Sequence, residues 1–145
     1  MILAIDPGTT QSGFVFFDET NRAVIQSGIE DNAIVRGLVG KFKRSGHKLA
    51  VEMIASYGMP VGREVFETCV FIGRLVELWE DDLQLVYRKD VKMHLCGSPR
   101  AKDANIRQAL IDLLGPQGTK KQPGPTYGVK SHAWAALGVA VTAAG

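Results

Sequence analysis

The chain alternates between short apolar runs and longer segments in which apolar residues recur every three or four positions. Continuous or alternating apolar runs predict β-strands, and the three- and four-residue spacing predicts amphipathic helices. Strands are expected at residues 2–5, 13–17, 23–29, 49–51 and 83–87. Helices are expected at residues 34–42, 64–80, 103–114 and 131–144.

This order of elements predicts an α/β fold with a mixed five-stranded sheet flanked by helices. The first three strands are joined by tight turns and should form an antiparallel meander. A helix separates the third strand from the fourth, so the fourth should return parallel to the first. With 145 residues and 46% hydrophobic content, we expect one well-filled core and a single domain over residues 1–145.

The opening hairpin, MILAIDPGTTQSGFVFF, places a carboxylate at the point where a buried strand ends. A strand covered on both faces is apolar throughout, and Asp6 interrupts this run abruptly. The loop that follows is rich in backbone N–H groups and hydroxyls, which suits a metal ion or a phosphate. Asp, Pro and Gly are also ordinary turn residues, so Asp6-Pro7-Gly8 alone does not establish a site.

Glu52 follows the fourth strand in the same way that Asp6 follows the first. In sheets with parallel strands, the carboxyl ends of the strands define the functional edge. A lone Glu at a strand end is usually a solvated residue, but its pairing with Asp6 favours a functional carboxylate pair.

Candidate nucleic-acid contacts are spread over several segments. Tyr57, Met59 and Arg63 lie in or beside a Gly/Pro-rich loop after Glu52, where they could stack on DNA, contact a phosphate or simply pack on the core. Segment 115–130 contains Pro, Gly and Lys, so we expect either a mobile strap over a phosphate backbone or a disordered surface loop. A basic turn is expected just past the fifth strand. The candidate phosphate contacts are Lys41, Lys43, Arg44, Arg63, Lys89, Lys92, Arg100, Lys102, Lys120, Lys121 and Lys130.

Composition bears on the partners and the cellular compartment of the protein. The formal net charge of +2 neither requires nor excludes a nucleic-acid partner. Cys69 and Cys96 lack metal-ligand spacing, so we expect free thiols and a reducing, cytoplasmic compartment. The first apolar run has no basic leader and no apolar run is long enough to cross a bilayer, so no membrane association is expected.

The predicted helix at residues 64–80 is apolar over more than one face, which is wider than a surface helix needs. Such a helix can lie centrally in the core or meet a second subunit. Cys69 and Gly73 would allow a partner helix to approach closely. A two-fold homodimer is therefore predicted, with a central core helix as the alternative.

Four motifs resemble the RuvC-like Holliday-junction resolvases of the RNase H superfamily along nearly the full chain. They are IDPGTTQSG at 5–13, VEM at 51–53, VKMHLCGSPRAKD at 91–103 and SHAWAALGVAV at 131–141. The ending GPTYGVKSHAWAALGVA is most similar to phage-type members. The first motif also resembles the phosphate-binding hairpin of the actin, Hsp70 and sugar-kinase ATPases, but those enzymes close two domains over a nucleotide.

The resemblance to the resolvases implies a homodimeric endonuclease that cuts branched DNA with two Mg²⁺ ions per active site, for which Mn²⁺ can substitute. Asp6 and Glu52 match the first two acidic ligands, and His132 matches a ligand on the last helix. Ala135 stands where the family pattern has another Asp, so Asp103 is a further candidate ligand. No nucleotide cofactor is implied, and a phage-encoded member would act in the cytoplasm of its bacterial host.

Three other functions remain open from the sequence. Loss of the Asp at Ala135 could leave a catalytically weakened protein that binds branched DNA. A related nuclease that cuts flaps or RNA would share the same motifs. The least favoured alternative is an actin- or Hsp70-like nucleotide-binding fragment.

Overall fold

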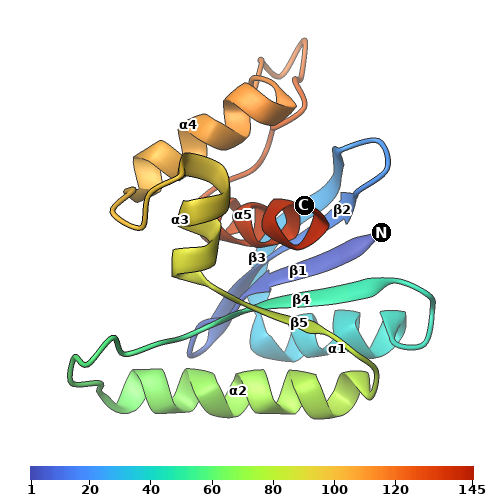
Figure 1. Cartoon of the computed structure of the whole chain (residues 1–145). Coiled ribbons are helices and arrows are strands. Elements are labelled where there is room, and N and C mark those ends of the chain that lie inside the picture. The colour runs from blue at the N-terminus through green and yellow to red at the C-terminus, as the bar shows by residue number, and fades with distance from the viewer.

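A computed structural model describes residues 1–145 as a five-stranded sheet with helices on both faces (Figure 1). The strands are β1 (Ile2–Asp6), β2 (Gln11–Asp18), β3 (Ala23–Asp31), β4 (Lys48–Met53) and β5 (Gln84–Tyr87). The helices are α1 (Asn32–Phe42), α2 (Arg63–Trp79), α3 (Arg88–Cys96), α4 (Asp103–Leu114) and α5 (His132–Ala144). Every strand and helix predicted from the sequence is present, and α3 is an additional element.

The strand order is β3-β2-β1-β4-β5. β2 pairs antiparallel with both β1 and β3, which confirms the predicted meander. β4 lies parallel to β1, and β5 lies parallel to β4. The carboxyl ends of β1, β4 and β5 therefore meet at one edge of the sheet, here called the carboxyl edge (Figure 1).

The two faces of the sheet bury separate hydrophobic clusters. Along β1, Ile2 and Ala4 belong to the cluster under α5, while Leu3 and Ile5 belong to the cluster under α1 and α2. Figure 1 shows α1 and α2 on one face and α5, with α3 and α4 beyond it, on the other. Both faces of β1 are covered, which explains its uninterrupted apolar run.

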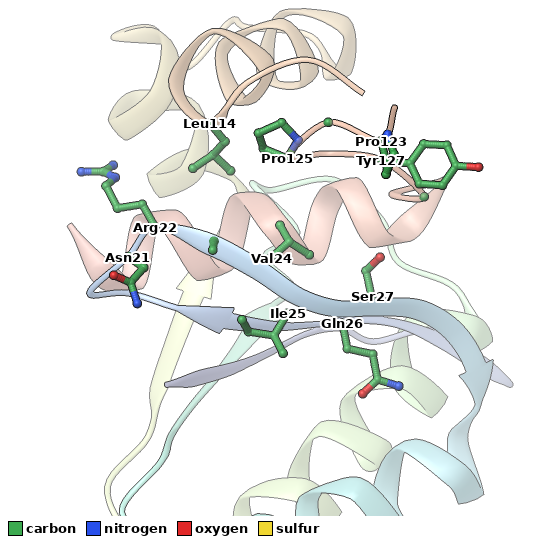
Figure 2. Close-up of a pocket in the computed structure, with 13 residues that line it drawn as sticks. Asn21, Arg22, Val24, Ile25, Gln26, Ser27, Leu114, Pro123, Pro125 and Tyr127 are labelled. Atoms are coloured by element: carbon green, nitrogen blue, oxygen red, sulfur yellow. The ribbon is translucent and has the colours of Figure 1, made fainter. Parts of the chain in front are cut away.

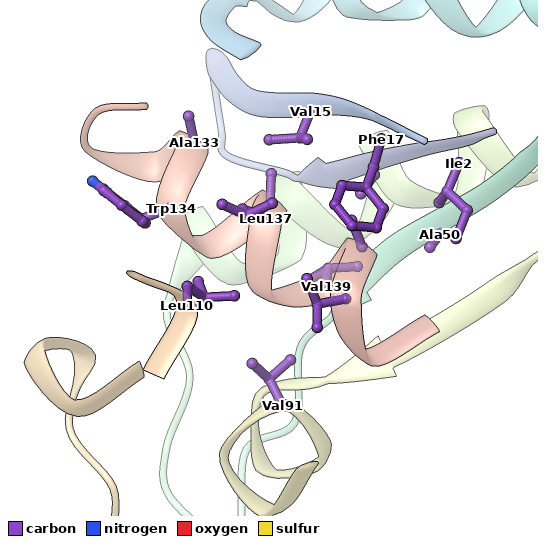
Figure 3. Packing of buried hydrophobic residues seen from close by; sticks show 14 of the residues in the cluster. Ile2, Val15, Phe17, Ala50, Val91, Leu110, Ala133, Trp134, Leu137 and Val139 are labelled. Carbon is purple, nitrogen blue, oxygen red and sulfur yellow. The ribbon is translucent and has the colours of Figure 1, made fainter. Parts of the chain in front are cut away.

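Small residues let α5 fit between the sheet and α3 (Figure 3). Leu137 and Val139 are fully buried, and they point toward different parts of the same cluster. A Cβ on Gly138 would lie 3.0 Å from Cγ1 of Val91, so the two helices approach closely there. The tight packing of α5 holds its first residue, His132, at the carboxyl edge.

Helix α3 replaces the basic turn that the sequence predicted after the fifth strand. The Tyr87 N–H donates to the Asp90 carboxylate at 3.0 Å, which caps the start of the helix. Val91 is fully buried and Leu95 packs against the same core cluster, one helical turn apart. Charged residues surround these two apolar positions, so the segment contains too few apolar positions to reveal a helical pattern.

Segment 115–130 is a folded loop rather than the mobile strap that its composition predicted. The Thr126 hydroxyl donates to the Gly115 carbonyl at 2.9 Å, and the Gly124 N–H donates to the Gln117 carbonyl at 2.9 Å. Thr126 and Val129 are buried. The loop borders a groove of about 680 Å³ beside β3, with Tyr127 on its rim (Figure 2).

Cys69 and Cys96 are free, as the sequence predicted. None of the helices combines the length and the apolar character that a bilayer-spanning segment requires.

Candidate active site

Asp6 and Glu52 lie next to each other at the carboxyl edge. Ile5 of β1 is paired with Val51 of β4, so the following residues on the two parallel strands are neighbours. The Asp6 side chain is only 12% exposed, and that of Glu52 is 16% exposed. The structure therefore brings together the two carboxylates that the sequence singled out.

The environment of this pair favours the protonated acid. The pKa of Glu52 is raised from an ordinary value of 4.5 to about 8, first by burial and then by its hydrogen bond with Asp6 and the negative charge of Asp6. Burial also raises the pKa of Asp6, while the hydrogen bond with Glu52 and the charge of Arg88 oppose that shift. Without a bound metal ion, this environment therefore favours the protonated form of Glu52 near neutral pH.

His132 is the third predicted site residue, and it contacts Asp6 of this pair. Its Nδ1 lies 3.0 Å from Oδ2 of Asp6, while 71% of its side chain remains exposed. Gly13 of β2 makes this approach possible, because a Cβ there would lie 2.5 Å from the His132 carbonyl. The first turn of α5 thus reaches the mouth of the opening hairpin.

Arg88, which was not among the predicted site residues, lies beside the carboxyl pair. Its Nη1 is 3.7 Å from Oε1 of Glu52, and its Nη2 forms an ion pair with Asp103. The only sequence signal was its position immediately after the fifth strand. Its contact with Glu52 depends on α3, which the sequence analysis missed.

The donor set is compatible with divalent cations. No group of three or more His, Cys, Asp or Glu side chains is arranged to hold a metal ion in this conformation. The two carboxyl groups nevertheless lie side by side at the ends of paired strands, and Oε1 of Glu52 is buried without a hydrogen-bond donor. Oxygen ligands suit Mg²⁺, and the His132 imidazole adds a nitrogen donor that suits Mn²⁺.

Two hollows flank Arg88. One has a volume of about 280 Å³, and its lining includes Asp103, His132 and Ala135. The other has a volume of about 380 Å³ and is lined by Tyr57, Arg88, Lys89, Lys92 and Pro99. Asp103 therefore faces the space beside Ala135, although its carboxylate is 88% exposed and bonds Arg88.

Several predicted DNA contacts lie at the carboxyl edge with the acidic pair. Met59 is 69% exposed in the loop before α2, and Arg63 begins α2 and bonds Glu67 at 2.6 Å. Lys130 comes two residues before His132. The candidate contacts near the carboxyl edge are Tyr57, Met59, Arg63, Lys89, Lys92, Arg100, Lys102 and Lys130.

The remaining basic candidates lie elsewhere. α1 starts beside the opening hairpin, where the Asn32 N–H donates to the Thr10 carbonyl, and runs to the opposite end of the sheet (Figure 1). Lys41, Lys43 and Arg44 therefore lie far from the carboxyl pair. Lys120 and Lys121 lie in the loop beyond the far end of α4 (Figure 1).

Polar groups in the loop after Asp6 form hydrogen bonds within the protein. Ser12 accepts a hydrogen bond from the Gly8 N–H at 3.2 Å and donates to the Asn32 side chain at 2.6 Å. The Asn32 amide donates to the carbonyls of Gly8 and Thr9. This network ties the loop after Asp6 to the start of α1, and it differs from the phosphate cradle that the sequence suggested.

Comparisons with known proteins support the fold. No protein-family model matches the sequence, and no curated protein sequence matches it. The chain is similar to the RuvC of T. thermophilus solved in complex with a Holliday-junction substrate, with a TM-score of 0.71 and 16% identity over 97% of this chain and 90% of that one. A second Thermus thermophilus RuvC structure gives a TM-score of 0.69 and 18% identity over 97% of this chain and 91% of that one. The chain therefore has the RuvC/RNase H-like fold, as its sequence predicted.

Proposed function

We propose that this protein is a metal-dependent endonuclease that hydrolyses phosphodiester bonds in four-way junctions and related branched DNA. The observation that carries the proposal is the buried Asp6–Glu52 pair, with His132 against Asp6, at the carboxyl edge of a RuvC-like sheet. The similar T. thermophilus RuvC was solved with a Holliday junction, which supports branched DNA as the substrate class. In this proposal, residues 1–145 form a single nuclease domain.

Asp6, Glu52 and His132 are the proposed ligands of two Mg²⁺ ions, for which Mn²⁺ can substitute, and Asp103 is a further candidate. When bound, two such ions lower the pKa of an attacking water and neutralise charge on the phosphate and the leaving oxygen.

The chain's own side chains position the reactants. Burial of Asp6 and Glu52 lowers the local dielectric, which strengthens their attraction for cations. His132 directs Nδ1 toward Asp6 and leaves most of its ring exposed at the mouth of the site. The second ring nitrogen would either coordinate a metal ion or form a hydrogen bond that steers the attacking water.

Branched DNA would be held mainly through its phosphates. Lys89 and Lys92 border the hollow next to Arg88, and Tyr57 presents an exposed ring there for stacking. A homodimer would bring two such sites to opposing strands, as symmetric nicking of a junction requires. The motif at residues 124–140 supports a phage-type resolvase that acts in the cytoplasm of a bacterial host.

A branched-DNA-binding protein with weakened catalysis is the second candidate. Ala135 lines the hollow beside His132 and offers no carboxylate where the resolvase pattern has one. The ATPase alternative is not supported, because the loop after Asp6 uses its Ser12 and Asn32 contacts internally.

The proposal is tested with a panel of labelled substrates. Four-way junction, flap and linear duplex DNA are incubated with the protein in Mg²⁺, in Mn²⁺ and in EDTA. We expect metal-dependent cleavage of the junction well above that of the linear duplex. Preference for the flap would assign a different branched substrate, and tight junction binding without cleavage in either metal would favour the second candidate.

A further inference from the structure

The position of Arg88 is set by the junction between β5 and α3. Arg88 is the first residue of α3 and directly follows β5, whose Val86 is paired with Glu52 of β4. Its side chain is 27% exposed, so the guanidinium is partly enclosed by the fold. The positively charged guanidinium of Arg88 therefore lies at the carboxyl edge, where the strands that carry Asp6 and Glu52 also end.

The two ends of this guanidinium have different environments. Nη2 is held by the Asp103 carboxylate, at the first residue of α4. Nη1 is buried without a hydrogen-bond partner and lies 3.7 Å from Oε1 of Glu52, which also lacks one. A buried donor without an acceptor is costly, and a catalytic role is one reason that native proteins retain such a group.

Arg88 also lines both hollows at the carboxyl edge. The hollow of about 380 Å³ on one side is bordered by Lys89 and Lys92 and carries positive charge. The hollow of about 280 Å³ on the other side contains His132 and Asp103. Arg88 is the residue that the two hollows share, so a phosphate chain that occupies both would pass beside its guanidinium.

We propose that Arg88 contacts the scissile phosphate directly and that Asp103 is the positioning residue that orients its guanidinium. This inference rests on the proposed nuclease function and identifies the phosphate contact within that site. The planar guanidinium can offer two parallel N–H groups to one phosphate, whereas a Lys offers a point charge. Nη1 has no hydrogen-bond acceptor in the metal-free protein, so it can donate to a phosphate oxygen.

This assignment gives Asp103 a role different from the metal ligand considered from the sequence. Its carboxylate is 88% exposed and engages Arg88 rather than Asp6 or Glu52. A positioning residue acts only through its partner, whereas a metal ligand acts independently of that partner. The two roles therefore predict different outcomes when both residues are changed together.

The test uses Arg88→Gln, Arg88→Lys, Asp103→Asn and the double variant Arg88→Gln/Asp103→Asn. Two quantities are measured for each: the salt dependence of four-way-junction affinity in EDTA, and the single-turnover cleavage rate in Mg²⁺ or Mn²⁺. Arg22→Gln is the matched control, because Arg22 lies in the β2–β3 turn at the opposite end of the sheet. Circular dichroism verifies that each variant is folded.

Arg88→Gln should slow cleavage by about 10²–10³-fold and lower the slope of log affinity against log salt by about one. Arg88→Lys should keep the wild-type salt slope but cleave at least about 10-fold more slowly, because it lacks the bidentate fork. Asp103→Asn should slow cleavage about 10-fold and cause no further loss in the Arg88→Gln background. Arg22→Gln should match the wild type in both measurements.

Wild-type-like cleavage and salt slope in Arg88→Gln would overturn the proposal. Equal further losses from Asp103→Asn in both backgrounds would overturn the positioning role. Failure of the nuclease proposal itself is a separate result, in which the wild type does not cleave in any metal. The salt slopes in EDTA would still decide whether Arg88 contacts a phosphate.

Discussion

The carboxyl groups of Asp6 and Glu52 are buried together, which affects stability as well as chemistry. In the metal-free protein, burial and Asp6 raise the pKa of Glu52 to about 8 from an ordinary 4.5. Between these two pH values, the unfolded chain has released a proton that the folded protein retains. Because the unfolded state then binds fewer protons, the free energy of unfolding falls as pH rises through this window.

Glu52→Gln should remove most of this pH dependence. In EDTA, we expect its Tm to exceed that of the wild type by about 3–8 °C at pH 8, and the difference to shrink toward pH 4.5. Thermal melts followed by circular dichroism measure the effect, with Glu30→Gln on the exposed surface of β3 as the control. Parallel Tm profiles for wild type and Glu52→Gln would contradict the assigned environment.

At the residue scale, the sequence predicted the groups whose position follows from strand direction alone. Asp6 and Glu52 end apolar strands in a strand–helix–strand order, so their proximity could be expected. Arg88 could not be assigned in this way, because its contacts with Glu52 and Asp103 depend on where α3 and α4 begin.

Helix α5 connects the core to the site. Its middle is buried against the sheet, and its first residue reaches Asp6 because Gly13 leaves room for the His132 backbone. The small residues of α5 predicted close packing, but only the structure identifies Gly13 as the point of approach. The sequence also failed to predict α3, because its two core positions lie among charged residues.

Gly13→Ala should displace the first turn of α5. The added Cβ would meet the His132 backbone at 2.5 Å, so we expect the free energy of unfolding to fall by about 1–3 kcal/mol and cleavage to weaken. Gly37→Ala is the control, because a Cβ there meets nothing within 4 Å in the middle of α1.

The control should gain about 0.5–1 kcal/mol of stability and retain its cleavage rate. Urea denaturation and single-turnover cleavage provide the two measurements. A Gly13→Ala protein as stable as the wild type would show that the approach of α5 is not constrained there.

For the whole molecule, the surface of α2 supports the proposed homodimer. Phe66 is 61% exposed and Val70 is 59% exposed, and they lie one helical turn apart on the outside of the sheet layer. The wide apolar pattern of this helix was visible in the sequence, but the choice between core and interface required knowing which side chains the fold leaves uncovered. The fold was also needed to sort the basic residues, because Lys41, Lys43 and Arg44 were predicted DNA contacts and lie far from Asp6.

Val70→Glu should weaken the dimer by about 100-fold or more, because it places a charge at the centre of the proposed interface. Light scattering coupled to size exclusion at micromolar protein should show a dimer mass for the wild type and a monomer mass for the variant. Leu113→Glu changes an equally apolar residue, 46% exposed on α4, and should leave the dimer mass unchanged. A monomeric wild type would contradict this account of the α2 surface.

The most direct test of the central claim compares the wild type with Asp6→Asn on a labelled four-way junction. We predict paired nicks by the wild type in Mg²⁺ or Mn²⁺ and none in EDTA. Asp6→Asn should bind the junction within about threefold of the wild type and lose cleavage by more than about 10³-fold, because a carboxamide cannot replace the carboxylate as a cation ligand. Cleavage by Asp6→Asn at the wild-type rate, or wild-type cleavage that persists in EDTA, would contradict the assignment of a metal-dependent nuclease site at Asp6.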